Sequence, residues 1–316
     1  MQRLTLERFQ VFFYLFGIAA GLLTGTAVPQ LTAGLSILLW PVLAVLLYCT
    51  FVQVPLLHMR QALTDRRFIV LNIIGNFVLL PLIVWALLWL LPDNPALRLG
   101  VLLVLLVPCT DWFITFSQLG KADTAGAISI TPLNLLLQLL LLPFYLWLML
   151  PTDSQPFTYD ISLLSAILIV LLPLGLAIVT EYYWARKPAQ HSARAQLAWW
   201  PVPLLTLVLF LIAATQVATV RGSGAVLVSV LPVFVLFLLL AALLAKWLGR
   251  CFGLPLTQSR TLAFSFGTRN SFVVLPLALL LPPGYEVAVV VIVLQSVVEL
   301  FGMVFYLWWL PNKLLK

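Results

Sequence analysis

The sequence has few charged residues, three cysteines and two histidines. Charged side chains make up 9% of the 316 residues, against about 25% in soluble domains, and the mean hydropathy is +1.12. An ordinary soluble protein is therefore excluded. Cys49, Cys109 and Cys251 lie in separate apolar stretches without CxxC spacing, so neither a disulfide framework nor a zinc site is expected.

The sequence also lacks the signatures of an enzyme. An intramembrane enzyme is the alternative to consider, but no HExxH or GxSxG motif occurs, and His58 and His191 lie between apolar stretches. We therefore expect no catalytic residues, no metal and no cofactor. A receptor is disfavoured because no stretch remains for a soluble output domain. The pI of 9.6 comes from dispersed basic loop residues, so no nucleic-acid partner is expected.

What the chain does have is ten long, leucine-rich apolar stretches. A membrane-spanning helix needs ~20 such residues, and the stretches do not alternate as barrel strands do. We predict an all-α membrane protein in which residues 1–316 form one polytopic domain in the lipid bilayer. The first stretch resembles a signal peptide but has no small-residue cleavage site, so we interpret it as a retained helix. The predicted spans are residues 10–27, 31–54, 68–92, 97–119, 124–150, 161–180, 198–220, 224–249, 261–281 and 286–310.

The basic residues are distributed asymmetrically between the connecting segments. With a cytoplasmic N-terminus, fourteen of the 17 Lys and Arg residues lie inside, only Arg98 and Arg221 lie outside, and Arg269 lies within a span. This pattern predicts a protein of the bacterial cytoplasmic membrane with both termini in the cytoplasm. The inside residues are Arg3, Arg8, Arg60, Arg66, Arg67, Lys121, Arg186, Lys187, Arg194, Lys246, Arg250, Arg260, Lys313 and Lys316.

The ten predicted spans divide into two groups of five. The loop between the groups, residues 151–160, is polar and contains no basic residue, which places it outside. The first half, about 1–150, then begins inside, whereas the second half, about 161–316, begins outside. This opposite topology predicts two inverted five-helix repeats, as in many secondary transporters.

The fourth span of each half is interrupted by polar residues. Pro108-Cys109-Thr110-Asp111 breaks residues 97–119, and the run 265–271, which contains Gly267, breaks residues 261–281. Proline removes a backbone donor and glycine permits unusual backbone angles. Each break alone can be a simple kink or a packing glycine. Two breaks at corresponding positions predict crossing helices that form a transport site.

Three charged residues lie within predicted spans: Asp111, Arg269 and Glu299. A guanidinium stays charged, and placing one near a bilayer centre costs at least ~2.5 kcal/mol. We therefore predict that Arg269 pairs with Asp111 across the crossing point. Carboxylates in a low-dielectric interior can exchange protons near neutral pH, so Asp111 and Glu299 are candidates for proton coupling. Glu299 is the freer of the two, although a structural hydrogen bond between helices is an alternative role.

Several polar side chains within the spans are candidates for lining a cavity. Asn72 and Asn76, like Asn134 and Gln138, are spaced four residues apart, as in polar contacts between membrane helices. The same stripes can instead face a transport route. The cavity-lining candidates are Asn76, Thr131, Asn134, Ser265 and Thr268.

The motifs at these positions resemble those of the bile acid/sodium symporter superfamily, and within it the arsenite permeases. The resemblance covers nearly the whole chain, and Pro108-Cys-Thr110 is the arsenite-permease form of the first break. It implies ten helices in two inverted repeats, a panel domain and a core domain, crossing fourth and ninth helices, and transport by alternating access. The matching motifs are Phe51-Val-Gln-Val-Pro55, Thr64-Asp-Arg-Arg-Phe68, Pro108-Cys-Thr110, Leu119-Gly-Lys121 and Arg269-Asn-Ser271.

The resemblance also implies that Cys109 takes part in arsenite handling. Soft centres such as trivalent arsenic favour sulfur ligands, whereas a lone membrane cysteine is otherwise a small core hydrophobe. Cys49 and Cys251 have no comparable context and are interpreted as structural. The expected substrate-binding residues are Cys109, Thr110, Asp111, Arg269, Asn270 and Ser271.

The sequence departs from both branches of the superfamily. Val273 stands where arsenite permeases carry a glutamate, and Phe113, Ile114, Ala127 and Arg269 stand where sodium-coupled relatives carry sodium ligands. We therefore predict a secondary active transporter that uses the proton gradient to export arsenite or a related small solute or anion. The alternative is a sodium-coupled symporter that takes up an organic anion.

Overall fold

The computed structural model describes residues 9–54, 65–150, 161–186 and 191–316. Every regular element within these ranges is a helix, and the described chain contains no strand. This confirms the predicted all-helical class. The loop 151–160 falls outside the described residues, as do Pro55, His58, Thr64 and the basic residues Arg3, Arg8, Arg60 and Lys187.

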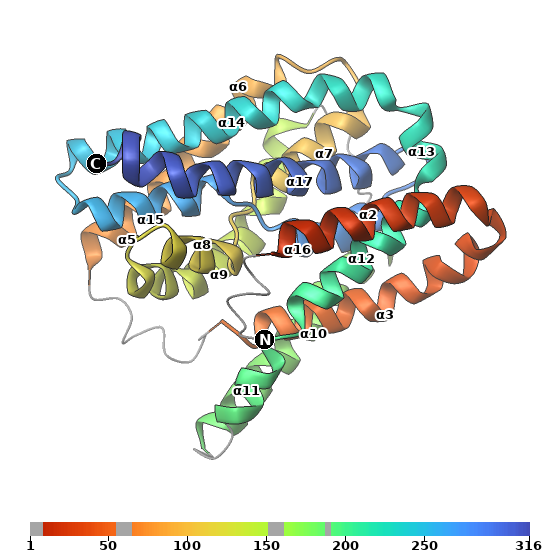
Figure 1. Ribbon diagram of the computed structural model, residues 1–316, viewed down its shortest axis with the longest axis horizontal. Helices are drawn as coiled ribbons and strands as arrows, with labels where there is room; N and C mark the ends of the chain where they lie inside the picture. The colour runs from red at the N-terminus through yellow and green to blue at the C-terminus, as the bar shows by residue number, and fades with distance from the viewer. Residues whose placement is uncertain (1–8, 55–64, 151–160, 187–190) are drawn as a thin grey trace.

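The helices follow one another along the chain with short connections (Figure 1). The first half contains α2 (Gln10–Ala27), η1 (Pro29–Leu31), α3 (Thr32–Phe51), α5 (Arg66–Ile74), η3 (Gly75–Leu79), α6 (Leu80–Leu88), α7 (Pro95–Leu105), α8 (Trp112–Leu119) and α9 (Thr124–Met149). The second half contains α10 (Ile161–Ala185), α11 (His191–Leu197), α12 (Pro201–Thr215), α13 (Val217–Gly222), α14 (Gly224–Cys251), α15 (Leu256–Gly267), α16 (Ser271–Leu279), α17 (Glu286–Trp309) and η6 (Leu310–Leu314).

Seven helices of the described chain are long and apolar enough to cross a membrane. The predicted fourth and ninth spans are not among them, because each is divided into two short helices, α7 with α8 and α15 with α16. The protein is therefore a multi-pass helical membrane protein. The seven are Gln10–Ala27, Pro29–Phe51, Arg66–Leu88, Thr124–Met149, Ala193–Thr215, Gly224–Cys251 and Glu286–Leu314.

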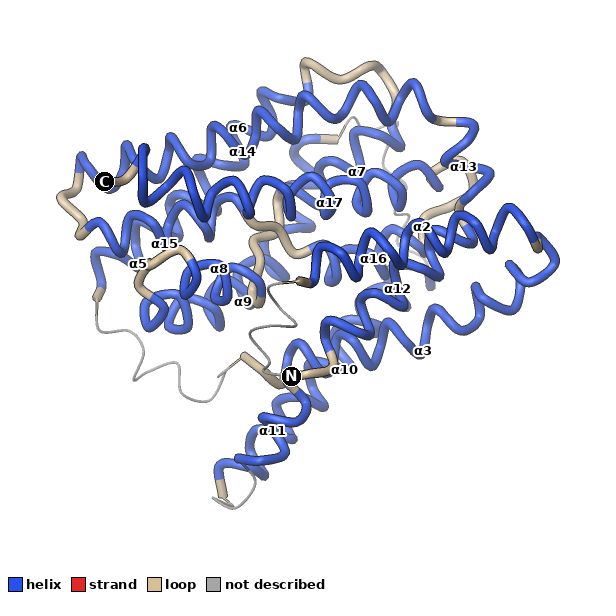
Figure 2. Tube along the Cα trace, in the orientation of Figure 1, coloured by secondary structure: helices blue, strands red, loops and turns tan. Residues whose placement is uncertain are grey.

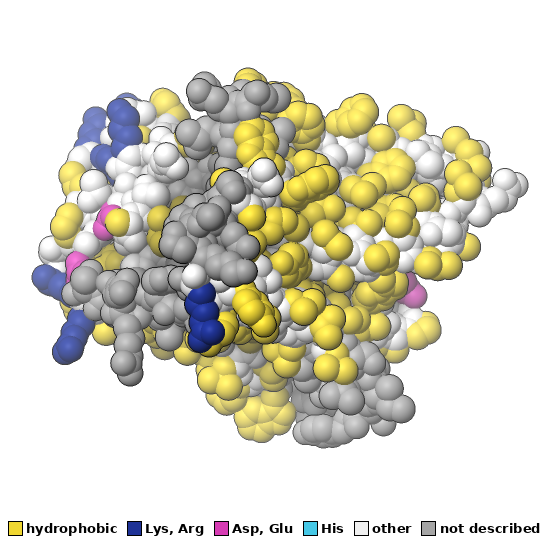
Figure 3. All heavy atoms as spheres, turned by 90° about the horizontal axis from the view of Figure 1, so that it is seen from below, with side chains coloured by type: hydrophobic (Ala, Val, Ile, Leu, Met, Phe, Trp, Pro, Cys, Tyr) yellow, Lys and Arg dark blue, Asp and Glu magenta, His cyan; other side chains and the backbone are white. Residues whose placement is uncertain are grey.

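The surface matches an apolar environment along most of the molecule. Figure 3 shows hydrophobic side chains over most of one face, with Lys and Arg side chains gathered at one end. Large apolar residues such as Phe16 and Trp89 are strongly exposed, which suits contact with lipid. The clustering of cations at one end agrees with the predicted positive-inside topology, which stays a prediction.

Helices α2, α3, α10 and α12 pack together as a unit that we call the α2–α12 layer. Its tightest contact uses three glycines, Gly17, Gly21 and Gly25, spaced four residues apart on α2. A Cβ atom at Gly21 would lie 2.3 Å from the Phe210 carbonyl oxygen, and one at Gly25 would lie 2.2 Å from that of Ala214. Small residues allow membrane helices to approach closely in this way. Helices α5, α6, α9, α14 and α17 pack against the two broken ones and form with them the second region of the molecule.

Candidate functional site at the helix crossing

The two broken helices meet through their unwound segments. Pro108 and Arg269 form an isolated antiparallel bridge, in which the Cys109 amide donates to the Thr268 carbonyl (3.1 Å) and the Asn270 amide donates to the Val107 carbonyl (2.8 Å). In Figure 2 these unwound segments lie among the helices. Each segment satisfies backbone groups that the other leaves exposed, as a non-aqueous interior requires. The predicted breaks are therefore confirmed.

The proline and the glycine contribute differently to the breaks. Helix α7 ends at Leu105, three residues before Pro108, so Pro108 is not a simple kink within a continuous helix. Helix α15 runs through Gly267 and stops after it. A Cβ atom at Gly267 would lie 2.8 Å from the Tyr306 ring and 2.9 Å from the Met303 methyl group. Gly267 is thus also a packing glycine against α17.

Asn270 connects the two crossing segments through its side chain. Its Oδ1 caps α16 by accepting from the Val273 amide (3.4 Å), and its Nδ2 donates to Thr110 Oγ1 (3.1 Å). The neighbouring Cys109 sulfur accepts a long hydrogen bond from the Asp111 amide (3.5 Å). Cys109, Thr110 and Asn270 are buried, whereas Asp111 is partly exposed at the start of α8. Four of the predicted substrate-binding residues therefore lie together at the crossing.

Arg269 is 2% exposed, and neutral oxygens surround its guanidinium. Nη1 donates to the Leu105 carbonyl (3.3 Å), and Nη2 donates to Asn76 Oδ1 (3.1 Å), the Ser265 carbonyl (3.3 Å) and the Phe266 carbonyl. The carbonyls belong to the C-terminal ends of α7 and α15, where the helix dipole favours a cation. The Phe237 ring lies beside the guanidinium, 5.1 Å from its central carbon.

The predicted ion pair between Arg269 and Asp111 is wrong. The guanidinium is directed toward the end of α7, whereas Asp111 precedes the start of α8, at the opposite end of the unwound segment. Arg269 forms no ion pair with any described residue. Helix-end carbonyls stabilise its charge instead.

Glu299 of α17 contacts the crossing from another direction. Its Oε2 accepts from the Arg269 backbone amide (2.8 Å) and from Gln295 Nε2 (2.7 Å). Gln295 Oε1 accepts from Ser271 Oγ (3.3 Å), and Ser271 accepts from Ser296 (2.7 Å). Glu299 is 1% exposed, and its Oε1 has no hydrogen-bond partner among the described residues. The structural hydrogen bond weighed as an alternative is therefore present, yet one carboxylate oxygen stays available.

A cluster of amides and hydroxyls extends from Arg269 toward α9. Asn76 donates to Asn72 Oδ1 and Ser265 Oγ (both 3.0 Å), and Ser265 donates to Asn72 Oδ1 (3.0 Å). Asn72 in turn donates to Asn134 Oδ1 of α9 (2.7 Å). The candidates Asn76, Ser265 and Asn134 thus form one network joined to Arg269.

Two other cavity-lining candidates bond to their own helices. The Thr131 hydroxyl donates to the Ala127 carbonyl (2.9 Å), and the Thr268 hydroxyl donates to the Phe264 carbonyl (2.7 Å). A further feature, the π-helical turn η3, includes Asn76 and has no recognisable signal in the sequence. Such turns are frequent at functional sites.

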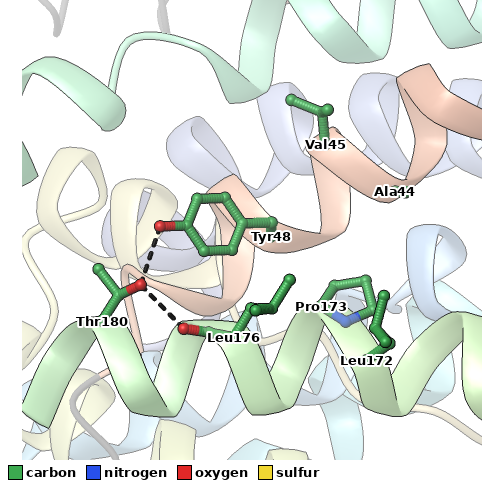
Figure 4. A pocket seen from close by; sticks show the side chains of 7 residues that line it. All are labelled: Ala44, Val45, Tyr48, Leu172, Pro173, Leu176 and Thr180. Atoms are coloured by element: carbon green, nitrogen blue, oxygen red, sulfur yellow. Dashed lines mark hydrogen bonds between the residues drawn. The ribbon is translucent and has the colours of Figure 1, made fainter.

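The other two cysteines and a surface groove lie on helices that carry no predicted site residue. Cys49 is buried and Cys251 is exposed at the end of α14; the interpretation of both as structural residues stays a prediction. A groove of about 380 Å³ lies between α3 and α10 (Figure 4), and the Tyr48 and Thr180 hydroxyls meet there at 3.0 Å. It contains no predicted site residue. Its lining is Ala44, Val45, Tyr48, Leu172, Pro173, Leu176 and Thr180.

Comparison with known proteins identifies the family of the chain. Residues 40–223, more than half of the chain, match the model of the sodium bile acid symporter family. The chain is also 27% identical over 187 residues to the arsenical-resistance protein Acr3 of Corynebacterium glutamicum. That similarity covers 54% of this chain and 50% of the relative, so the chain spans about half the length of the relative it matches. On the family match, the chain belongs to the sodium bile acid symporter family.

Proposed function

We propose that this protein is a secondary active transporter that moves a small solute by alternating access through the helix crossing. The observation that carries the proposal is the antiparallel contact of two broken helices around a buried polar cluster. Unwound backbone inside a membrane protein survives only where it is buried or lines a transport route. Membership of a symporter family supports the same function, and an enzyme is not proposed.

The arrangement of the helices supports the inverted repeat and its two domains. The broken helices are the fourth predicted span of each half, and the α2–α12 layer combines the first two spans of each half. We assign this layer as the panel domain and the helices around the crossing as the core domain. The two halves, about 1–150 and 161–316, are then related by opposite topology, and the core moves against the panel.

We propose arsenite or a related small solute as the substrate. The support is the Acr3 relative, whose printed name is an arsenical-resistance protein, and the position of a thiol, Cys109, within the crossing bridge. Trivalent arsenic favours sulfur ligands. Thr110, Asn270 and Ser271 add hydroxyl and amide groups to the same site.

Matched cysteine variants in proteoliposomes test this assignment. Cys109→Ser is expected to lower arsenite transport about tenfold or more, since a lost ligand worth about 1.4 kcal/mol has that effect. Cys49→Ser and Cys251→Ser are the controls and should transport normally. Arsenite binding that survives Cys109→Ser would remove the thiol from the mechanism.

We further propose that Glu299 couples transport to protons, with Asp111 as a second candidate. The unpartnered Oε1 of Glu299 can accept a proton while Oε2 keeps its two bonds to Arg269 and Gln295. Glu299→Gln preserves an acceptor oxygen but cannot titrate. We expect it to abolish transport driven by a pH gradient while leaving passive exchange of substrate. Glu286→Gln, which changes an exposed carboxylate at the start of α17, is the control.

The alternative function is sodium-coupled uptake of an organic anion, which the description of the matched family favours. Transport measured with a sodium gradient alone and with a proton gradient alone separates the two. Strict dependence on sodium would replace the proton proposal, whereas transport in sodium-free buffer would support it.

A further inference from the structure

Gln138 on α9 is a buried side chain without any hydrogen-bond partner among the described residues. It is 1% exposed, and both Nε2 and Oε1 lack a partner. One turn before it, Asn134 uses its Oδ1 to accept from Asn72, while its own Nδ2 also has no partner. Buried amides are nearly always paired, because leaving them unpaired is costly. Two amide groups on one face of α9 therefore have hydrogen-bonding atoms that no described residue satisfies.

The neighbouring contacts show which part of the molecule Gln138 faces. Asn134 contacts Asn72 of α5, and further along α9 the Tyr145 hydroxyl donates to the Phe77 carbonyl of η3 (2.5 Å). Gln138 lies between these two contacts on the same face of α9, four residues after Asn134. It therefore faces the junction of α5 with the π-helical turn η3. This junction also holds Asn76, which bonds to Arg269.

We propose that Gln138 and Asn134 form a second subsite for the transported solute, specific for an uncharged molecule that carries several hydroxyl groups. The two unpartnered NH₂ groups donate to hydroxyl oxygens, and Gln138 Oε1 accepts from a hydroxyl hydrogen. The unpartnered groups of Gln138 and Asn134 are uncharged amides, which favours a neutral ligand over an ion at this subsite. Asn72 and Asn76 connect the subsite to the crossing, and Cys109 is no part of it.

This subsite rests on the proposed transport function, and its role differs from that of Cys109. A thiol recognises a soft centre, whereas amides recognise the hydroxyl groups around it. Boric acid, a neutral trihydroxide without thiol affinity, is therefore a probe for the amides alone. Arsenite, which at neutral pH is also a trihydroxide, is a probe for both.

The first test uses Gln138→Met in the full chain, which keeps length and removes both polar groups. We expect KM for arsenite to rise about tenfold, as the loss of one or two hydrogen bonds predicts, with little change in kcat. Gln53→Met is the matched control, because within the described part of the chain the Gln53 side chain bonds only to the carbonyl of Cys49, near the end of α3. An unchanged KM together with a raised Tm would show that Gln138 is only an unpaired buried amide, and would overturn the proposal.

The second test measures binding without transport. Boric acid is expected to raise the Tm of the wild type and of Cys109→Ser by about 2–4 °C, and to leave that of Gln138→Met unchanged. The absence of a shift in the wild type, or an equal shift in Gln138→Met, would overturn the subsite. If the wild type transports nothing but shows the Gln138-dependent shift, the transport proposal fails and the subsite stands.

Discussion

The α2–α12 layer and the helix crossing solve the problem of close helix approach in opposite ways. In the layer, Gly17, Gly21 and Gly25 let two continuous helices touch through backbone atoms. At the crossing, the helices end, and their unwound segments and terminal carbonyls bond to each other and to buried side chains such as Arg269. The contact in the layer depends on close packing at small residues, whereas the contact at the crossing depends on hydrogen bonds. The difference is consistent with the proposed roles of the layer as a rigid support and of the crossing as the solute site.

The largest expected effect is on the glycine contact of the layer. In Gly21→Leu, the new Cβ atom would meet the Phe210 carbonyl oxygen at 2.3 Å and the Ala213 methyl group at 2.9 Å. Neither backbone nor a methyl group can rotate away, so α2 and α12 must separate. We expect a loss of about 3 kcal/mol in unfolding free energy, measured by thermal unfolding. Gly34→Leu, at a position with open space, is the control, and equal stability of the two variants would contradict the close contact.

The next prediction concerns the neutral hydrogen-bond partners of the Arg269 guanidinium. Arg269→Met leaves Asn76 Oδ1 and several helix-end carbonyls without their donor, at a cost of about 2–3 kcal/mol. Double-mutant cycles separate the possible partners. The pair Arg269→Met with Asn76→Ala should show a coupling energy of about 1 kcal/mol, because the side chains are bonded. The pair with Asp111→Ala should be additive, and strong coupling there would restore the ion pair that the structure lacks.

These two regions also differ in how far the sequence predicted them. The breaks were predictable because proline, glycine and polar residues interrupt otherwise apolar runs, and Pro108 and Arg269 do lie at the crossing. The partners of Arg269 were not predictable, because they include backbone carbonyls at helix ends, which the residue types in a sequence do not reveal. Charge alone therefore suggested Asp111. The position of η3 along the chain was also not predictable, because a π-helical turn depends on packing such as that of Gly75 against the Phe266 ring.

A smaller effect is expected at the cap that joins the crossing helices. Asn270→Ala removes the cap of α16 and the bond to Thr110, while Asn94→Ala removes only the cap of α7. Loss of a cap costs about 1 kcal/mol in either case, and Asn270→Ala also loses the buried bond to Thr110, so its Tm should be the lower of the two. Only Asn270→Ala should also reduce transport, because Thr110 lies in the proposed substrate site. Equal transport by both variants would mean that Asn270 acts only as a cap.

The smallest effect is expected where Asp65 links α5 to α15. Asp65 Oδ1 caps α5 at the Phe68 amide (3.1 Å), and Oδ2 accepts from Gln258 of α15 (2.8 Å). The bond from Gln258 lowers the pKa of Asp65 most, and the bond from the Phe68 amide lowers it further, so this pKa lies below its ordinary value. The ionised carboxylate therefore adds stability above its unfolded pKa of ~3.9, and this contribution disappears as the pH falls through the lower folded value.

Comparing unfolding of the wild type and Asp65→Asn across this acidic range measures the contribution. The wild type should be more stable above pH ~4, by less than about 1 kcal/mol for such a partly exposed group, and the difference should vanish in stronger acid. Asp93→Asn, which changes an exposed partner of Arg98, is the control and should leave the linkage between α5 and α15 intact. A stability difference between wild type and Asp65→Asn that does not change with pH would show that the amide loses packing or geometry rather than charge.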